Sequence, residues 1–346
     1  MAKIVHVVHC VDAEGPLYES LETTFERLRE LFGVSAIEPS RENLQKLQRG
    51  QIPLGGKEAL VQQAFSSHLV TYLEDWSSLT AMLARVMSES FRCQVPDSFG
   101  GSYRYNWFCV DHVGYDVNPR RRTLGYHAIF DHYRELLQRL GETRDGLHWH
   151  AHTMSMYREA HRCATSLLNS PHIWEGLARR IIERRWFPAC ARAGFQTERP
   201  DMHWFLEQYI PFDFSNTSVE DRSEWEAQTD LAQGRFADWR LARKDWGVYH
   251  PSHDNYQLPG ACRRWIARAL NILNRFANLT AVEVEKAFRQ AQEGRPTLLA
   301  IASHDFRDLG AEVEYFHKVL VDTQAKFPDV KFRYCEALEA FRAVAH

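Results

Sequence analysis

The chain has 346 residues, of which 45% are hydrophobic and 25% charged, and it holds no run of about 20 apolar residues that would span a bilayer. A formal net charge of −3 disfavours a nucleic-acid binder, which would need a strongly basic face. The first residues lack the basic and long apolar regions of a secretory signal, and the seven cysteines include no CxxC spacing. We therefore expect a soluble, cytoplasmic protein with no membrane span and no nucleic-acid partner.

The first predicted element is a buried strand that ends in two carboxylates. Residues 3–11 are apolar and β-branched, and Asp12 and Glu14 follow directly, separated by Ala13. In parallel α/β folds the carboxyl ends of the strands face the active site. One carboxylate of such a pair can bind a metal ion while the other acts as a base. The alternative is that the pair only caps the next helix.

The segment 17–90 is predicted to be helical. Residues 20–33 have helical spacing and end in a glycine, residues 49–56 form a loop, and residues 57–87 make a long helical pattern. This stretch is longer than an ordinary connection between a strand and its helix. We expect a helical insertion that covers the active site and favours a small substrate.

A second strand is predicted at 105–110 and a helix at 128–141, after which comes the sequence GLHWHAHTM. Alternation along an extended chain places His148, His150 and His152 on one face. Three imidazoles on one face are costly to bury without partners, and imidazole is a common zinc ligand. The cluster therefore predicts a metal site. A partly exposed edge strand with unrelated histidines is the alternative.

Further strands are predicted at 210–215, 296–306 and 330–335, and helices at 312–327 and 336–345. This alternation of strands and helices favours a parallel barrel or an open α/β sheet. Because no internal repeat or low-complexity linker interrupts the pattern, we interpret residues 1–346 as a single catalytic domain.

Two more groups of residues are candidates for function. His304 lies at the end of an apolar strand and is followed by Asp305, so that neighbouring charge can set its pKa and it can act as a general acid. Arg199 and Trp204 lie in a polar, aromatic segment that we interpret as a loop. There an arginine can orient a carboxylate and a tryptophan can pack on a sugar face. A structural role is the alternative for each.

These segments, in this order, resemble the polysaccharide deacetylase superfamily, the metal-dependent carbohydrate esterases built on a distorted (β/α) barrel. The likeness covers nearly the whole chain. The family's first motif is an acidic pair at the end of the first strand, and VDAEGP is similar to it. The resemblance implies that Asp12 is the catalytic base and Glu14 a metal ligand. Ala13 departs from the adjacent aspartates of the common form.

The second family motif is a pair of metal-binding histidines four residues apart. His148 and His152 have this spacing. The lead-in DGLHW, however, resembles a form in which His150 is the first ligand, so His150 and His152 are an equally good pair. The resemblance thus implies that two of the three histidines bind the ion without selecting them.

The remaining motifs supply the substrate groove and the acid. RPDMHW and the following FDFS resemble the third motif, which implies substrate contacts from Arg199 and Trp204. LLAIASHDF matches the last motif, which implies that His304 protonates the leaving amine, with Asp305 beside it in the substrate site.

The activity implied by the resemblance is that of a metal-dependent N-deacetylase acting on an N-acetylated sugar or a sugar-containing precursor. Zinc is the expected divalent metal ion, although histidine and carboxylate ligands also suit cobalt, nickel or iron. Two alternatives stay open. One is a hydrolase of another non-peptide carbon–nitrogen bond in a small metabolite, and the other is an inactive relative that only binds carbohydrate.

Overall fold

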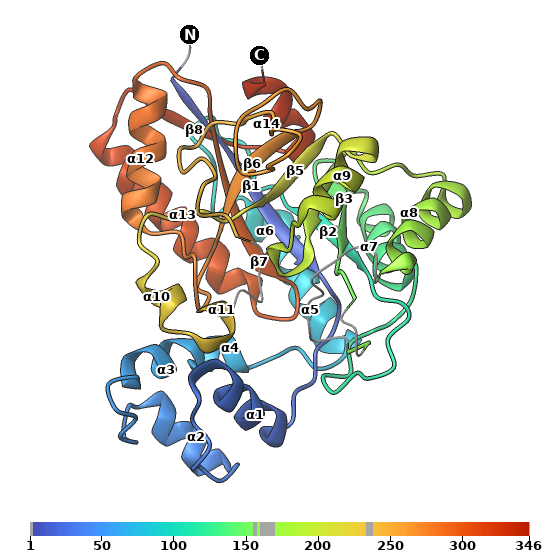
Figure 1. Ribbon diagram of the computed structural model, residues 1–346. Helices are drawn as coiled ribbons and strands as arrows, with labels where there is room; N and C mark the ends of the chain where they lie inside the picture. The colour runs from blue at the N-terminus through green and yellow to red at the C-terminus, as the bar shows by residue number, and fades with distance from the viewer. Residues whose placement is uncertain (1–2, 155–157, 160–169, 233–237, 346) are drawn as a thin grey trace.

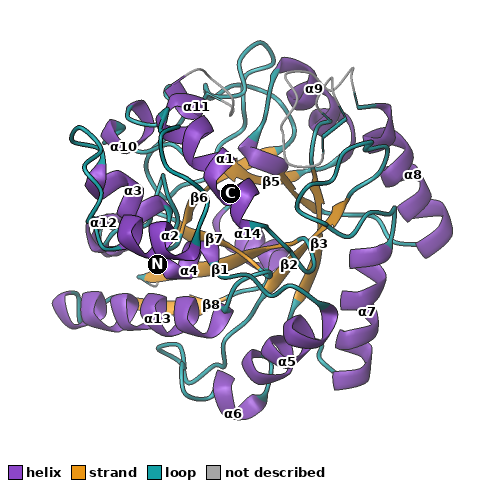
Figure 2. Cartoon of the chain, turned by 90° about the horizontal axis from the view of Figure 1, so that it is seen from below, coloured by secondary structure: helices purple, strands orange, loops and turns teal. Residues whose placement is uncertain are grey.

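Seven parallel strands close into a barrel in the computed structural model, which describes residues 3–154, 158–159, 170–232 and 238–345 (Figures 1 and 2). Around the ring the strands run β2-β3-β4-β5-β6-β7-β1, and pairing of β1 with β2 closes it. The strands are β1 (Ile4–Ala13), β2 (Asn106–Asp111), β3 (Gly146–Ala151), β4 (Cys190–Ala193), β5 (Phe212–Asn216), β6 (Trp265–Asn271), β7 (Thr297–His304) and β8 (Lys331–Tyr334). The expected parallel α/β barrel is confirmed at this level.

Strand β1 is long enough to pair with three neighbours. Its first half pairs with β8, its second half pairs with β2, and β7 runs beside nearly all of it. The register aligns Asp12 with His304 of β7 and with Phe108 of β2. Because every pairing in the ring is parallel, the carboxyl ends of all seven strands meet at one end of the barrel.

The barrel interior is filled by small and aromatic side chains. One buried cluster takes residues from β1, β2, β4, β5, β6 and β7, and so lies inside the ring: Val8, Cys10, Phe108, Cys190, Phe214, Ala267, Ala269, Leu298, Ala300 and Ala302. The alternate residues of β1, such as Val7 and Val11, belong to a separate cluster outside the ring. Helix α14 (Ala337–Val344) adds Phe341 to the interior cluster and thereby closes the amino-terminal end of the barrel.

Helices surround the ring, as Figure 2 shows. They are α5 (Trp76–Val86), α6 (Glu89–Arg92), α7 (Ala128–Leu140), α8 (Pro171–Arg184), α9 (Pro200–Tyr209), α10 (Ser223–Glu226), α11 (Thr229–Ala232), α12 (Ala281–Gln292) and α13 (Leu309–Lys326). The apolar stripes of α5, α7, α12 and α13 pack in one cluster with the outward side chains of the strands.

Four helices after β1 lie at the carboxyl-terminal end of the barrel (Figure 1). They are α1 (Leu21–Phe32), α2 (Arg41–Gln48), α3 (Glu58–Ala64) and α4 (Ser67–Val70). Helices α1, α2 and α3 share a buried cluster of their own, which includes Phe25, Phe32, Leu47 and Val61. The expected helical content of 17–90 is therefore present, with its own small core.

The long helical pattern expected over 57–87 is broken into three helices. Helix α3 ends at Ala64, α4 covers only Ser67–Val70, and α5 begins after Asp75. Asp75 accepts a hydrogen bond from the backbone of Ser78, and Ser78 bonds back to Asp75 in a capping box. The spacing of apolar residues continues through Asp75, but the short polar side chain of Asp75 hydrogen-bonds to the backbone and so begins a new helix there.

Strands β4 and β6 and helices α9, α10, α11 and α12 are among the elements not expected from the sequence. Each of these strands carries a buried arginine: Arg192 of β4 points into the ring toward Asp12, and Arg268 of β6 points outward to Glu283 of α12. A buried guanidinium hides the apolar pattern of a strand. The interpretation of the segment around Arg199 and Trp204 as a loop is wrong. The segment forms helix α9, which Pro200 starts at its first position, where a missing N–H costs nothing.

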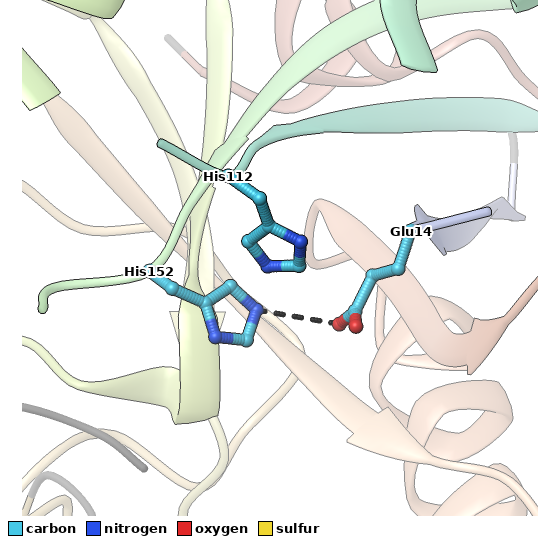
Figure 3. A group of neighbouring side chains, drawn as sticks. All are labelled: Glu14, His112 and His152. Atoms are coloured by element: carbon cyan, nitrogen blue, oxygen red, sulfur yellow. Dashed lines mark hydrogen bonds and ion pairs between the residues drawn. The ribbon is translucent and has the colours of Figure 1, made fainter. Parts of the chain in front are cut away.

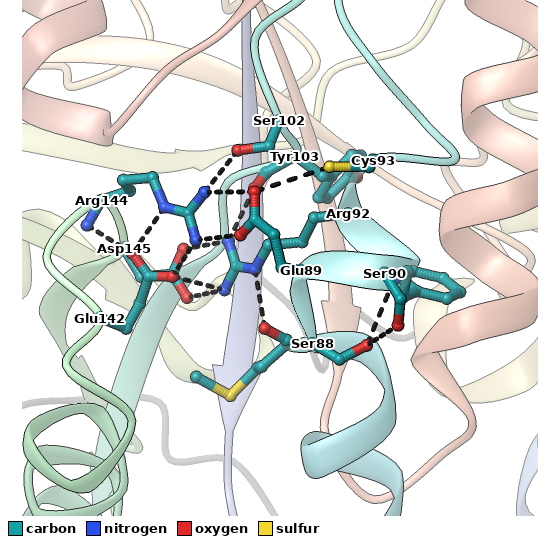
Figure 4. A network of polar contacts seen from close by, with 12 residues as sticks. Ser88, Glu89, Ser90, Arg92, Cys93, Ser102, Tyr103, Glu142, Arg144 and Asp145 are labelled. Atoms are coloured by element: carbon teal, nitrogen blue, oxygen red, sulfur yellow. Dashed lines mark hydrogen bonds and ion pairs between the residues drawn. The ribbon is translucent and has the colours of Figure 1, made fainter.

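A buried ion pair anchors α6 to the amino-terminal ends of β2 and β3 (Figure 4). Arg92 is fully buried and donates two hydrogen bonds to Asp145, at 2.8 and 2.7 Å. Asp145 also accepts the backbone N–H of Tyr105 at 3.0 Å and the indole N–H of Trp107 at 3.2 Å. With these donors the carboxylate is fully satisfied, as a buried charge requires.

Candidate metal centre

The acid pair at the end of β1 faces the carboxyl-terminal end of the barrel interior. Asp12 is the next-to-last residue of β1 and is 2% exposed. Both of its carboxylate oxygens accept from Nε of Arg192, at 2.8 and 3.0 Å, and Arg192 is held in turn by the carbonyl of Phe214 at 2.7 Å. A buried arginine thus fixes the orientation of Asp12.

Glu14 lies just beyond β1 and is equally buried. Its Oε1 atom lies 3.3 Å from Nε2 of His152 and 3.6 Å from Nε2 of His150, while Oε2 contacts the guanidinium of Arg122. Burial acts to raise the pKa of Glu14, but Arg122 and His152 outweigh it and hold that pKa well below its usual range. The carboxylate is therefore charged at neutral pH.

Asp305 fixes the turn that carries Glu14. Its two carboxylate oxygens accept the backbone N–H groups of Glu14 and Gly15, each at 2.9 Å, and one of them also accepts the hydroxyl of Tyr133 at 2.8 Å. Gly15 has φ of +75°, and a Cβ there would lie 2.7 Å from Cδ1 of Ile129. Burial raises the pKa of Asp305 to about 7. The structure thus gives Asp305 the contacts of a group that positions Glu14.

His112 and His152 complete a cluster with Glu14, as Figure 3 shows. His112 follows β2, His152 follows β3, and one ligand atom from each of the three residues lies within 4.8 Å of the other two. His112 is 1% exposed, and among the described residues neither of its ring nitrogens has a hydrogen-bond partner. Nδ1 of His152 also lacks one there.

This cluster fits a divalent metal ion. Burial lowers the pKa of both His112 and His152, so that both rings are neutral and present lone pairs. Burying an imidazole with no partner for either nitrogen destabilises the fold unless a ligand binds one of the nitrogens. Two neutral imidazoles and one carboxylate match a catalytic zinc site, which has three protein ligands and an open position.

His150 lies between the cluster and Asp12. Its Nδ1 is 2.8 Å from the carbonyl oxygen of Arg192, and its Nε2 is 3.0 Å from Nε2 of His152. Burial opposes its protonation, but the carboxylates of Asp12 and Glu14 raise the pKa of His150 above its usual value. His150 thus touches the cluster through His152 and can hold a proton there.

His304 lies across from these groups at the end of β7. Its Nε2 is 3.9 Å from Oδ2 of Asp12 and 3.9 Å from Oε1 of Glu14. Its side chain is 18% exposed and lines a cavity. Burial lowers the pKa of His304 to about 3, so the resting imidazole is neutral.

The structure does not bring His148 to this cluster. Its Nε2 lies 3.2 Å from Oδ1 of Asn106 and 3.2 Å from Oε1 of Glu336, the residue that caps α14 at the other end of the barrel. In a strand each residue advances the chain by about 3.3 Å, so residues four apart are separated by roughly 13 Å. The i, i+4 spacing of His148 and His152 therefore separates them, whereas His150 and His152 lie together.

Arg199 and Trp204 also lie outside this group. Arg199 precedes the first turn of α9, and Trp204 is 53% exposed on the same helix. Neither is among the described residues that line the cavity beside His304. His203, the residue before Trp204, accepts from Arg264, and its Nε2 lies 3.0 Å from the carbonyl oxygen of Ser252.

Three residues of the site were missed by the sequence analysis. His112 follows β2 directly, as Glu14 follows β1, so its place at a strand end was a usable signal. Arg122 lies in a polar stretch that resembles a solvated surface loop, and Arg192 lies in a strand that was not predicted. No local pattern marks either arginine as the partner of a carboxylate more than 100 residues away.

The cavity has a volume of about 550 Å³ and extends from the barrel to α1 and α4. Its barrel side is formed by Asp12, Glu14, His150, His152 and His304. Its outer side includes these residues of the helical region and the loops: Leu17, Thr23, Glu26, Arg27, Arg29, Glu30, Leu31, Leu69, Tyr72, Arg120, Arg122, Glu159, Phe195, Arg275, Phe276, Phe306 and Arg307. The helices after β1 thus cover the site.

Comparison with known proteins gives no family for the chain. No family model matches it, and no curated protein matches it significantly. The closed parallel barrel is compatible with a TIM-like fold, while the likeness to deacetylases depends on the motifs given above. Among the described residues, every helix is too short or too polar to cross a membrane.

Proposed function

We propose that the chain is a metal-dependent hydrolase of carbon–nitrogen bonds, an N-deacetylase of an N-acetylated sugar or sugar-containing precursor. One observation carries the proposal. Glu14, His112 and His152 converge within 4.8 Å, and the nitrogens of His112 have no partner among the described residues. Asp12 and His304 lie beside this cluster, where a base and an acid are needed.

The ion, for which we propose zinc, would be held by Glu14, His112 and His152. Bound there, it would act as a Lewis acid that polarises the amide carbonyl and makes a water molecule more acidic. Arg122 contacts the other oxygen of Glu14 and leaves Oε1 directed at the histidines. This arrangement keeps one carboxylate oxygen available as a ligand.

Asp12 and His304 would move the protons. Asp12 is held by Arg192 and accepts a proton from the attacking water. His304 is neutral at rest, so it can accept that proton from Asp12, whose Oδ2 lies 3.9 Å away, and pass it to the leaving nitrogen. The water oxygen joins the acyl carbon as the carbon–nitrogen bond breaks, giving a carboxylic acid and an amine.

A second candidate is hydrolysis of another carbon–nitrogen bond in a small metabolite. The observation that favours it is the size of the cavity, about 550 Å³, closed on one side by α1 and α4. This volume lies within the range of small-molecule sites, roughly 300–1,000 Å³. Both candidates use the same residues and differ only in the acyl compound.

The test begins with metal content and turnover. Protein stripped with a chelator and reloaded with one equivalent of zinc is assayed for acetate release from N-acetylated sugars and for amine release from linear and cyclic amides. We expect hydrolysis that depends on the ion. The substitution Glu14→Gln should abolish both metal binding and turnover, whereas Asp12→Asn should abolish turnover alone.

The substitution His148→Gln is the matched control, because it changes a buried histidine of the same strand outside the cluster. It should keep both metal and turnover. A protein that binds zinc but hydrolyses none of these compounds would support the binding-only alternative. A protein that binds no stoichiometric ion would contradict the proposal.

A further inference from the structure

One wall of the cavity carries three arginines that the proposed hydrolysis does not use. Arg27 comes from α1, Arg120 from the loop after β2, and Arg307 from the loop after β7. Phe306 packs against both Arg307 and His304. The three arginine side chains approach one another although they are widely separated in the sequence.

A single buried carboxylate lies behind two of the three. Oε1 of Glu19 accepts from Nη2 of Arg27 at 2.7 Å, and its Oε2 lies 2.8 Å from Nε of Arg120. The Glu19 side chain is completely buried, so it is a fixed part of the wall. Among these three residues one negative charge lies between two guanidinium groups, and the cavity is also lined by Glu26, Glu30 and Arg29 of α1.

Arg307 adds a third guanidinium to this wall. Its Nε atom is buried and has no hydrogen-bond partner among the residues that the structure describes. The guanidinium packs on Phe306, 5.0 Å from the ring centre, and Tyr72, at 6.0 Å. Glu312 attracts it and offsets part of its charge; Oε1 of Glu312 is bonded to His68 at 2.8 Å, and its Oε2 has no hydrogen-bond partner among the described residues.

Burial disfavours the charged form of Arg307. Burial lowers the pKa of Arg307, Tyr72 and Glu312 act to raise it, and repulsion from Arg27 and Arg120 lowers it further. A desolvated guanidinium with unused donors is stabilised by an anion that accepts from it, and its planar fork matches the oxygens of a carboxylate or phosphate.

Backbone hydrogen bonds hold this wall together. The N–H of Leu73 donates to the carbonyl of Phe306 at 2.9 Å, and the N–H of Leu17 donates to the carbonyl of Leu73 at 3.0 Å. The N–H of Tyr18 donates to the carbonyl of Arg120 at 3.1 Å. These bonds link the segments that carry the arginines, so the wall is organised before any ligand binds.

We propose that Arg27, Arg120 and Arg307 bind an oxyanion carried by the substrate, either a phosphate ester or a carboxylate. The His304 and Phe306 rings are 4.8 Å apart and Arg307 lies 5.0 Å from Phe306, which places the guanidinium within about 10 Å of His304. This span suits an anionic group on the sugar that carries the reacting amide. The link to the substrate rests on the proposed function, whereas oxyanion binding does not.

Oxyanion binding is tested on metal-free protein. Titration calorimetry with inorganic phosphate in the presence of a chelator compares the wild type with Arg307→Gln and with Arg139→Gln, which removes an exposed arginine of α7. Loss of a charge-assisted hydrogen bond should weaken binding by about 10- to 100-fold in Arg307→Gln. Arg139→Gln should bind like the wild type.

Equal phosphate affinity in the wild type and Arg307→Gln, or no binding by the wild type, would overturn the proposal. If Arg307→Gln fails to fold, Arg307→Lys takes its place. Lysine keeps the charge but lacks the fork, so a smaller loss of affinity is expected, and unchanged affinity would count against the subsite.

Kinetics on the zinc-loaded protein connect the subsite to the substrate. Three N-acetylated sugars are compared, one neutral, one phosphorylated and one with a carboxylate, and the larger preference identifies the oxyanion. Arg307→Gln should lower kcat/KM for the charged compounds and leave the neutral one unchanged. An equal loss on all three would refute the subsite but not the hydrolase, and phosphate binding without any hydrolysis would refute the hydrolase but not the subsite.

Discussion

Because the ring nitrogens of His112 have no partner among the described residues, we expect the effect of replacing His112 on stability to depend on the metal ion. We consider His112→Leu, which replaces the imidazole with an apolar side chain of similar size. In the metal-free protein this substitution removes a buried polar ring whose missing hydrogen bonds cost about 1–3 kcal/mol. It also loses the ring contacts with His152 and Tyr115, at 5.1 and 5.6 Å. The two effects offset, so stability should change by less than about 1 kcal/mol.

With metal bound, the wild type should be clearly more stable than His112→Leu. At a free ion concentration 100 times the dissociation constant, the wild type gains about 2.7 kcal/mol of stability. Loss of a direct ligand should weaken binding by at least about 100-fold, the upper end of what changes to supporting residues cause. The same ion concentration then equals the dissociation constant of the variant, whose gain falls to about 0.4 kcal/mol.

The assay is urea unfolding, monitored by circular dichroism, with chelator and with buffered zinc. His148→Leu is the control, since His148 lies beside Asn106 and Glu336 and away from the cluster. The control should be destabilised without metal and should keep the full metal-dependent gain. If His112→Leu keeps that gain, His112 is not a ligand. If His148→Leu loses it too, the loss of metal binding is not specific to the cluster. Either result refutes the reasoning from the unpaired nitrogens.

Three further predictions concern other parts of the molecule. Asp12→Asn should keep stoichiometric zinc, measured by elemental analysis, while turnover falls by about 100-fold or more; an active variant would exclude Asp12 as the base. Asp145→Leu leaves Arg92 buried without its carboxylate and should cost about 3–5 kcal/mol in urea unfolding, whereas a cost below about 1 kcal/mol would show that Arg92 finds another partner. Burial holds the pKa of His9 at about 3, below the value of about 6.5 in the unfolded chain, so the stability from neutral His9 is complete above pH 6.5 and is lost as the pH falls. Unfolding at pH 7 and pH 5 should show a loss of about 2 kcal/mol that His9→Gln lacks; equal losses in both proteins would contradict the low pKa.

The sequence predicted the parts of the barrel whose apolar runs are uninterrupted. Strands β1 and β7 are nearly continuous runs of apolar residues, which is typical of strands buried on both faces. Strand β4 has four residues and contains Arg192, so neither its length nor its polarity distinguishes it from a loop. Its arginine is explained only by Asp12, which lies 180 residues away in the chain and becomes a neighbour when the ring closes.

The candidate site shows the same division. Asp12, Glu14 and His304 were expected together because each ends an apolar strand, and parallel strands bring such ends to one place. The choice among His148, His150 and His152 depended on a distance along the strand that a motif spacing does not contain. His112 was missed because a single histidine after a strand has no periodic pattern.

The filled amino-terminal end of the barrel restricts how molecules pass through the site. Phe108, Phe214 and Phe341 pack on one another inside the ring, with α14 behind them, so within the described residues no path runs from the cluster through the ring. In this part of the chain, a reactant and both of its fragments reach the cluster from the carboxyl-terminal end, beside α1. The larger fragment therefore has to leave before the next molecule can enter, and a long polymer cannot thread through the ring.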